Sequence, residues 1–233
     1  DFYLCNNCNT TNSSYSNFGH SYEAGKFQAN KNSALAGAYN FMAEEVEVFE
    51  LNTKPFKTTG GFDSKLIKST DFETLYKWIN NGKKVTLDLL YRGTKDGFDA
   101  ADFHSKCDKK GPNLVVCKSK THNKIFGGFN SKSWSTKGDY VDDPKAFLFS
   151  LTHKTIMKPI ASDCALYCSN EYGPVFGAGY DLLICTNSNV IKSSSSTLGL
   201  TYSSSGVSGD SSKYLAGDTS FLLDEIEVFR VVF

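Results

Sequence analysis

The segment Leu215-Ala216-Gly217-Asp218-Thr219-Ser220-Phe221-Leu222-Leu223-Asp224-Glu225-Ile226-Glu227-Val228-Phe229 has a close counterpart earlier in the same chain. Residues 35–49 read LAGAYNFMAEEVEVF, and the match extends without a gap over residues 1–51 and 181–231. A repeat unit of this length is the size of a domain and is too long for a solenoid. The sequence therefore predicts one complete repeat preceded by the last part of another.

Both copies of this segment end in an alternating pattern that is typical of a strand. Side chains two positions apart on a strand share a face, so Glu225 and Glu227, like Glu45 and Glu47, form a pair of acids. We expect a solvated strand face, with Lys or Arg on a neighbouring strand as partner. A docking contact for a protein partner is the second interpretation, and acid–base catalysis is the third.

Composition shifts divide the chain into three parts. Residues 1–51 are the end of the first repeat, residues 52–61 carry the Pro and Gly of a linker, and residues 62–233 form the complete repeat. Residues 1–51 hold about three strands, too few to be stable alone, so we expect them to pair either with residues upstream of them or with a neighbouring copy.

The complete repeat begins with helices and continues with strands. We expect a helix at 71–80 that starts with a capping box at Thr70 and Glu73, and a second at 100–106 capped by Asp99. Strands are expected at 85–92, 114–118, 124–130, 146–151 and 155–160. This order predicts an α+β fold, because little helix separates the strands.

Charge and hydropathy exclude two classes of partner. Lys plus Arg and Asp plus Glu both number 25, so no basic field indicates nucleic acid. No apolar run approaches the roughly 18 residues of a membrane span. The seven cysteines are scattered, which favours reduced thiols in a cytoplasmic protein. Cys5 and Cys8 have zinc-site spacing, but Ser188 replaces the second cysteine in the later copy.

The remaining polar motifs favour structural roles, and we expect no metal or cofactor. The glycines at 127–128 and 173–179 lack the strand-to-helix context of a phosphate loop, so close approach of sheets or sharp turns explain them better. The four histidines share no metal spacing. Asp139, Asp142 and Asp143 are expected in a solvated loop rather than around a metal ion.

Cysteine redox chemistry is the most specific enzymatic hypothesis. Cys107 lies among lysines but at the end of a predicted helix, where the helix dipole disfavours a thiolate. Cys164 and Cys168 are four positions apart and could pair.

Several motifs together resemble the TLD (TLDc) domain family. They are LLYRGTKDGF at 89–98, CDKKGPNL at 107–114, IFGGF at 125–129 followed by Trp134, FLFSL at 147–151, GPVFGAGYD at 173–181 and EIEVF at 225–229. The resemblance implies two antiparallel sheets packed as a sandwich with short flanking helices. It also implies protection against oxidative damage and regulation of the vacuolar proton pump (V-ATPase), without established enzymatic activity.

The sequence thus predicts a non-enzymatic interaction module that docks on the V-ATPase or supports oxidative-stress defence. The alternative is a structural component of a cytoskeletal or ciliary lattice built from tandem repeats.

Overall fold

The computed structural model describes residues 63–233 and, before them, only residues 2–4, 10, 12, 14–16, 40, 41 and 43. The chain divides into two units, residues 1–53 and residues 54–233. Within the described residues, no helix has the length and apolar character needed to cross a membrane.

The larger unit combines short helices with many strands. Its helical elements are η2 (Ser69–Asp71), α1 (Phe72–Asn80), α2 (Gly93–Asp96), α3 (Ala100–Cys107) and η3 (Ser162–Cys164). Its strands are β4 (Thr86–Arg92), β5 (Asn113–Ser119), β6 (Ile125–Asn130), β7 (Lys137–Val141), β8 (Phe147–Ser150), β9 (Thr155–Met157), β10 (Leu166–Ser169), β11 (Tyr172–Phe176), β12 (Leu182–Cys185), β13 (Ser194–Ser195), β14 (Ser220–Phe221) and β15 (Leu223–Val232).

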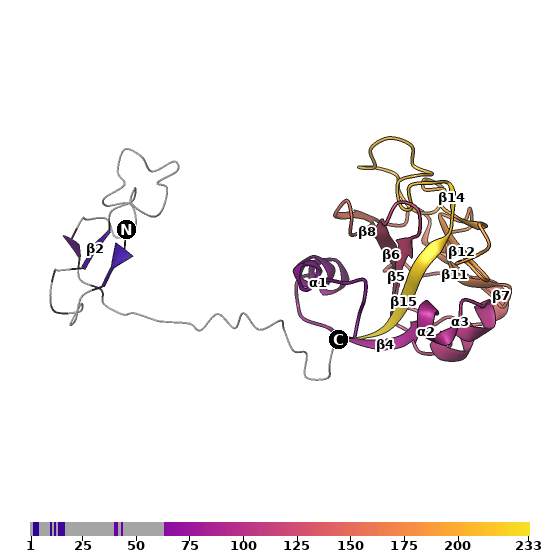
Figure 1. Ribbon diagram of the computed structural model, residues 1–233, viewed down its shortest axis with the longest axis horizontal. Coiled ribbons are helices and arrows are strands. Elements are labelled where there is room, and N and C mark those ends of the chain that lie inside the picture. The colour runs from indigo at the N-terminus through magenta and orange to yellow at the C-terminus, as the bar shows by residue number, and fades with distance from the viewer. Residues whose placement is uncertain are drawn as a thin grey trace. The chain divides into compact units, whose positions relative to one another are not determined.

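These strands form two six-stranded antiparallel sheets (Figure 1). Sheet I has the order β4-β15-β5-β6-β8-β9, and sheet II has the order β14-β13-β12-β11-β10-β7. Strand β15, the yellow arrow of Figure 1, therefore lies in the interior of sheet I, between β4 and β5. The predicted α+β sandwich is confirmed.

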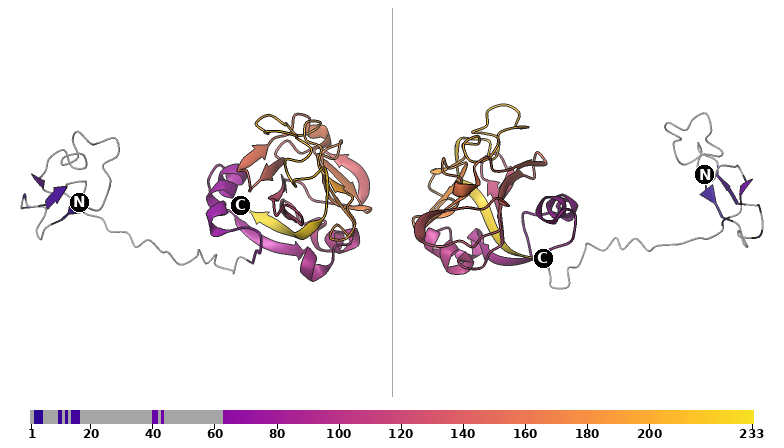
Figure 2. Two further views of the ribbon diagram at one scale, coloured as in Figure 1. Left: turned by 45° about the horizontal axis from the view of Figure 1, so that its top comes forward. Right: turned by 180° about the vertical axis from the view of Figure 1, so that it is seen from behind.

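Alternating side chains give sheet I an apolar layer on each face. Val115 and Cys117 of β5 point into the core shared with sheet II, whereas Leu114 and Val116 point to the opposite face. Helix α1 covers that opposite face and adds Leu75, which is fully buried. The order of layers is α1, sheet I, sheet II (Figure 2), with α2 and α3 beside β4.

The start of α3 follows the capping rule used for the prediction, whereas the start of α1 does not. Asp99 caps α3 as predicted, since its Oδ1 accepts a hydrogen bond from the Ala101 N–H at 2.8 Å. The prediction of a capping box at Thr70 and Glu73 is wrong. A 3₁₀ turn, η2, precedes α1, and the Asp71 carboxylate accepts instead from the Lys68 N–H at 2.8 Å.

The glycines of β6 allow close approach of neighbouring elements. A Cβ at Gly127 would overlap the carbonyl oxygen of Val115, and one at Gly128 would lie 2.5 Å from Cζ of Phe176 in sheet II. The expectation of close packing at 127–128 is confirmed.

In the smaller unit, β1 (Phe2–Tyr3), β2 (Ser14–Ser16) and β3 (Asn40–Phe41) form a three-stranded sheet. Its register repeats that of β12, β13 and β14 at an offset of 180 positions. The pair Tyr3 and Tyr15 corresponds to Leu183 and Ser195. The pairs 14/41 and 15/40 likewise correspond to 194/221 and 195/220. The sequence repeat thus extends to strand pairing.

Candidate functional site: a buried carboxylate network

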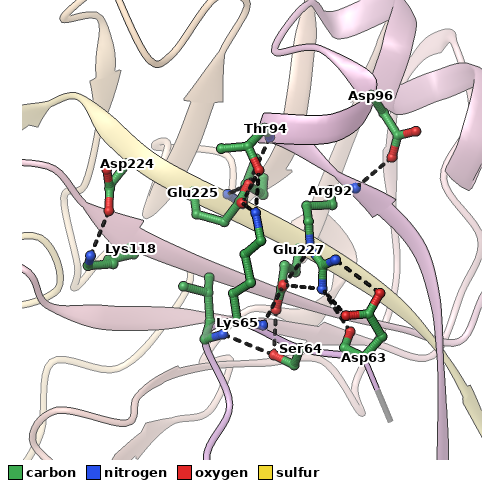
Figure 3. A network of polar contacts seen from close by, with 12 residues as sticks. Asp63, Ser64, Lys65, Arg92, Thr94, Asp96, Lys118, Asp224, Glu225 and Glu227 are labelled. Carbon is green, nitrogen blue, oxygen red and sulfur yellow. Dashed lines mark hydrogen bonds and ion pairs between the residues drawn. The ribbon is translucent and has the colours of Figure 1, made fainter. Parts of the chain in front are cut away.

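Two acidic side chains of β15 meet the segment that leads into α1 (Figure 3). Glu225 and Glu227 lie on the same face of β15 as Phe229 and Val231, the face that α1 covers. Residues 63–67, here called the clasp, run across this face, and Leu66 and Ile67 are buried there. Glu227 is 0% exposed and Glu225 is 4% exposed.

The carboxylate of Glu227 is fully engaged by hydrogen-bond donors. Its Oε1 accepts from the Lys65 N–H and from Nε of Arg92, both at 2.9 Å. Its Oε2 accepts from the Ser64 hydroxyl at 2.5 Å. A buried carboxylate without such partners would be strongly unfavourable, so these donors make the burial of Glu227 possible.

Arg92 joins Glu227 to the clasp. The guanidinium NH2 lies 2.8 Å from Glu227 Oε1, and NH1 and NH2 donate to both oxygens of Asp63 at 3.0 and 2.9 Å. The hydrogen bond from Arg92 lowers the pKa of Asp63, and the bond to Asp63 raises the pKa of Arg92. The bidentate geometry with Asp63 is the arrangement that a guanidinium favours with a carboxylate.

Glu225 fixes the turn after β4. Its Oε1 accepts from the Thr94 N–H at 2.9 Å, and its Oε2 accepts from the Thr94 hydroxyl. The Lys65 ammonium lies 3.5 Å from Oε2. Thr94 stands in the first turn of α2, where backbone N–H groups are free to bind an acid.

The expectation of a solvated face for Glu225 and Glu227 is therefore wrong, because both carboxylates are buried against the clasp. The expected cationic partner on a neighbouring strand is confirmed for Glu227, since Arg92 lies opposite it on β4. The role of both glutamates in partner docking stays a prediction, and Glu45 and Glu47 lie outside the described residues. The sequence did bring Arg92 and Thr94 into view, since both belong to the motif at 89–98. Asp63 and Ser64 were missed because they directly follow the predicted linker and belong to no motif.

A groove of about 440 Å³ opens over Glu225. Lys65, Lys68, Lys118 and Asp224 line it, so its rim is charged. Lys118 and Asp224 form an ion pair of 2.6 Å across β5 and β15. The network is suited to holding the clasp in place below a charged surface, because its carboxylates are already bound to internal donors.

The cysteine candidates lie apart from this network. Cys107 is 0% exposed and Cys168 is 1% exposed, and burial raises the pKa of both thiols. Cys164 is partly exposed. All three are free thiols, so the pairing of Cys164 with Cys168 is wrong. A buried thiol with a raised pKa is poorly suited to redox catalysis.

The other polar candidates hold loops. Asp143 is 0% exposed and binds the backbone N–H groups of Ser131 and Lys132 at 2.6 and 3.2 Å, so the expectation of a solvated loop is wrong for this residue. Asp139 and Asp142 are exposed as expected, but Asp139 lies in strand β7 and not in a loop. Within the part of the chain that the structure describes, no three His, Cys, Asp or Glu side chains are grouped for a metal ion.

The fold and the site define a class: an α+β sandwich domain whose N-terminal clasp is bound to the internal strand β15. The family model of the TLDc domain matches residues 61–232. The chain belongs to the TLDc domain family. The match covers one copy, and the earlier partial copy stays a prediction from the internal repeat.

One curated relative is the "MTOR-associated protein MEAK7" of Danio rerio, which is 30% identical over 73 residues. The aligned segment covers 31% of this chain and 16% of the relative, so the chain spans about a sixth of the relative's length.

Proposed function

We propose that this chain is a non-enzymatic module that binds the vacuolar proton pump. The supporting observation is the TLDc match over residues 61–232, because the family resemblance implies pump regulation. Oxidative-stress defence through thiol chemistry is less well supported, since Cys107 and Cys168 are buried with raised pKa values. Protection against oxidation would then be indirect.

We place the docking face at the charged groove over Glu225. Charged rims accelerate association and select partners more than they add affinity. Lys68 and Lys118 stand at this rim, while the network below keeps the clasp and the start of α2 fixed. A fixed surface loses little conformational entropy on binding.

The direct test is co-sedimentation of the chain with purified V-ATPase. Lys68→Glu reverses one rim charge and is expected to weaken binding, whereas Lys137→Glu on β7 makes the same change on sheet II and is expected to leave it unchanged. Equal binding by all three proteins would place the docking face elsewhere. No binding of the unmodified chain would overturn the pump proposal.

A structural lattice is the second candidate, and one observation favours it. The pairing of β1, β2 and β3 repeats that of β12, β13 and β14 at a constant offset. Tandem copies of this kind offer the same surface at regular intervals. Light scattering on the purified 233-residue chain separates the two candidates, because a particle near 25.7 kDa contradicts a lattice and one many times larger supports it.

The relative's printed name offers another partner. Co-sedimentation with MTOR in place of the pump tests whether that association extends to this chain.

A further inference from the structure

A second groove, of about 620 Å³, lies where the end of α1 meets sheet I. Trp78 and Ile79 of α1 form one side, and Phe129 of β6 and Phe147 of β8 form the other. The groove shares no lining residue with the groove over Glu225. It is therefore a separate surface, and its assignment does not rest on the pump proposal.

The apolar part of this groove is aromatic and firmly packed. The rings of Phe129 and Phe147 stack with centroids 5.2 Å apart, and Trp78 packs against Phe149 at 6.0 Å. Phe149 is fully buried, so Trp78 rests on the core while it remains partly exposed itself. Phe129 and Phe147 are 3% and 4% exposed, so they form the floor of the groove, and the apolar surface open to an occupant is that of the partly exposed Trp78 and Ile79.

The polar part of the groove is positively charged. Lys145 and Lys158 line it, and none of the lining residues is acidic. Neither lysine forms an ion pair within residues 63–233. The Lys145 N–H donates to buried Asp143 at 3.2 Å, which fixes the backbone that carries this lysine. Two lysines without carboxylate partners beside an apolar surface are complementary to an acidic, apolar ligand.

The shape of the groove favours a peptide over a small molecule. Small ligands are typically enclosed over most of their surface. Here Trp78, Ile79 and Ile156 are only partly buried, and Phe233 is 65% exposed, so an occupant is covered on one side alone. This is the geometry in which an amphipathic segment lays its apolar face into a groove.

We propose that this groove binds an acidic amphipathic peptide segment of a partner protein. Its apolar side chains lie on Trp78 and Ile79, and its carboxylates face Lys145 and Lys158. The end of α1, at Asn80, also lines the groove. Because the C-terminus of a helix carries a partial negative charge, it directs the carboxylates toward the lysine side.

Tryptophan fluorescence measures this binding directly. The chain has two tryptophans, and Trp134 is 1% exposed in the core between the sheets, so a change on binding reports on Trp78. The probe is a synthetic peptide that alternates Leu-Phe with Glu-Glu, and the matched control peptide carries Lys in place of Glu. We expect a blue shift and a Kd of about micromolar order with the acidic peptide, weakening with salt.

The decisive variant is Lys145→Glu/Lys158→Glu, expected to lower the affinity by about tenfold or more through loss and reversal of charge. Lys137→Glu/Lys213→Glu makes the same net change away from the groove and is expected to bind normally. Urea unfolding curves establish that both variants fold. Undiminished binding by the groove variant, or equal binding of the lysine peptide, overturns the proposal. So does a blue shift with phosphatidylserine vesicles and none with the acidic peptide, which would assign the groove to lipid.

Discussion

Substitution of Arg92 by Met tests whether the clasp network stabilises the fold. Methionine has a similar length but no donors, so Glu227, at 0% exposure, would lose its one cationic partner among residues 63–233, whose guanidinium lies 2.8 Å away. Breaking a buried ion pair by removing one partner costs about 3–5 kcal/mol. With a urea slope of about 2 kcal/mol per M, the unfolding midpoint is expected to fall by about 1.5–2.5 M.

Lys118→Met is the matched control, because it removes the Lys118–Asp224 pair on neighbouring strands. That pair is short, 2.6 Å, but its side chains are 30% and 49% exposed. Exposed pairs contribute less than about 1 kcal/mol. Both variants are compared with the original chain by urea unfolding followed by circular dichroism.

The double variant Arg92→Met/Glu227→Met removes the uncompensated charge and is expected to recover part of the stability lost by Arg92→Met alone. If Arg92→Met costs no more than Lys118→Met, or if the double variant is less stable than the single one, the network is not what holds the clasp.

Two further predictions concern the core. Maleimide should modify Cys164 in the folded protein but Cys107 and Cys168 only after unfolding, as read by peptide mass spectrometry; rapid native labelling of Cys107 would restore the redox hypothesis. Gly128→Ala should lower the unfolding free energy by about 1–3 kcal/mol, because the new Cβ lies 2.5 Å from the Phe176 ring; an unchanged urea midpoint would show that the sheets can separate there.

Local rules predicted much of the fold. Asp99 marks the start of α3, and the strands expected at 114–118 and 124–130 are present as β5 and β6, which pair with each other. The start of α1 was misplaced by one residue, because η2 ends at Asp71 and the helix begins at Phe72. A rule that reads only the capping pattern does not anticipate a 3₁₀ turn.

The candidate site was harder to predict because its parts are distant in sequence. The sequence Glu225-Ile226-Glu227-Val228 is compatible with a solvated polar face. Alternation assigns the two glutamates to one face of the strand, but it does not show whether that face is buried against a cationic side chain. The cationic side chain is that of Arg92, 135 positions before Glu227. The clasp belongs to a segment that the composition places at the boundary of a linker. Asp143 shows the same limit, because its partners Ser131 and Lys132 belong to another loop.

The internal position of β15 has a consequence for the order of biosynthesis. Arg92 and Glu227 are 135 positions apart, and at about 5–20 residues per second roughly 7–27 s separate their synthesis. Until β15 leaves the ribosome, β4 and β5 have no strand between them, and both present unpaired backbone groups. Nascent chains of this domain thus present two open strand edges until residues 223–232 have been translated, and open edges of this kind favour aggregation.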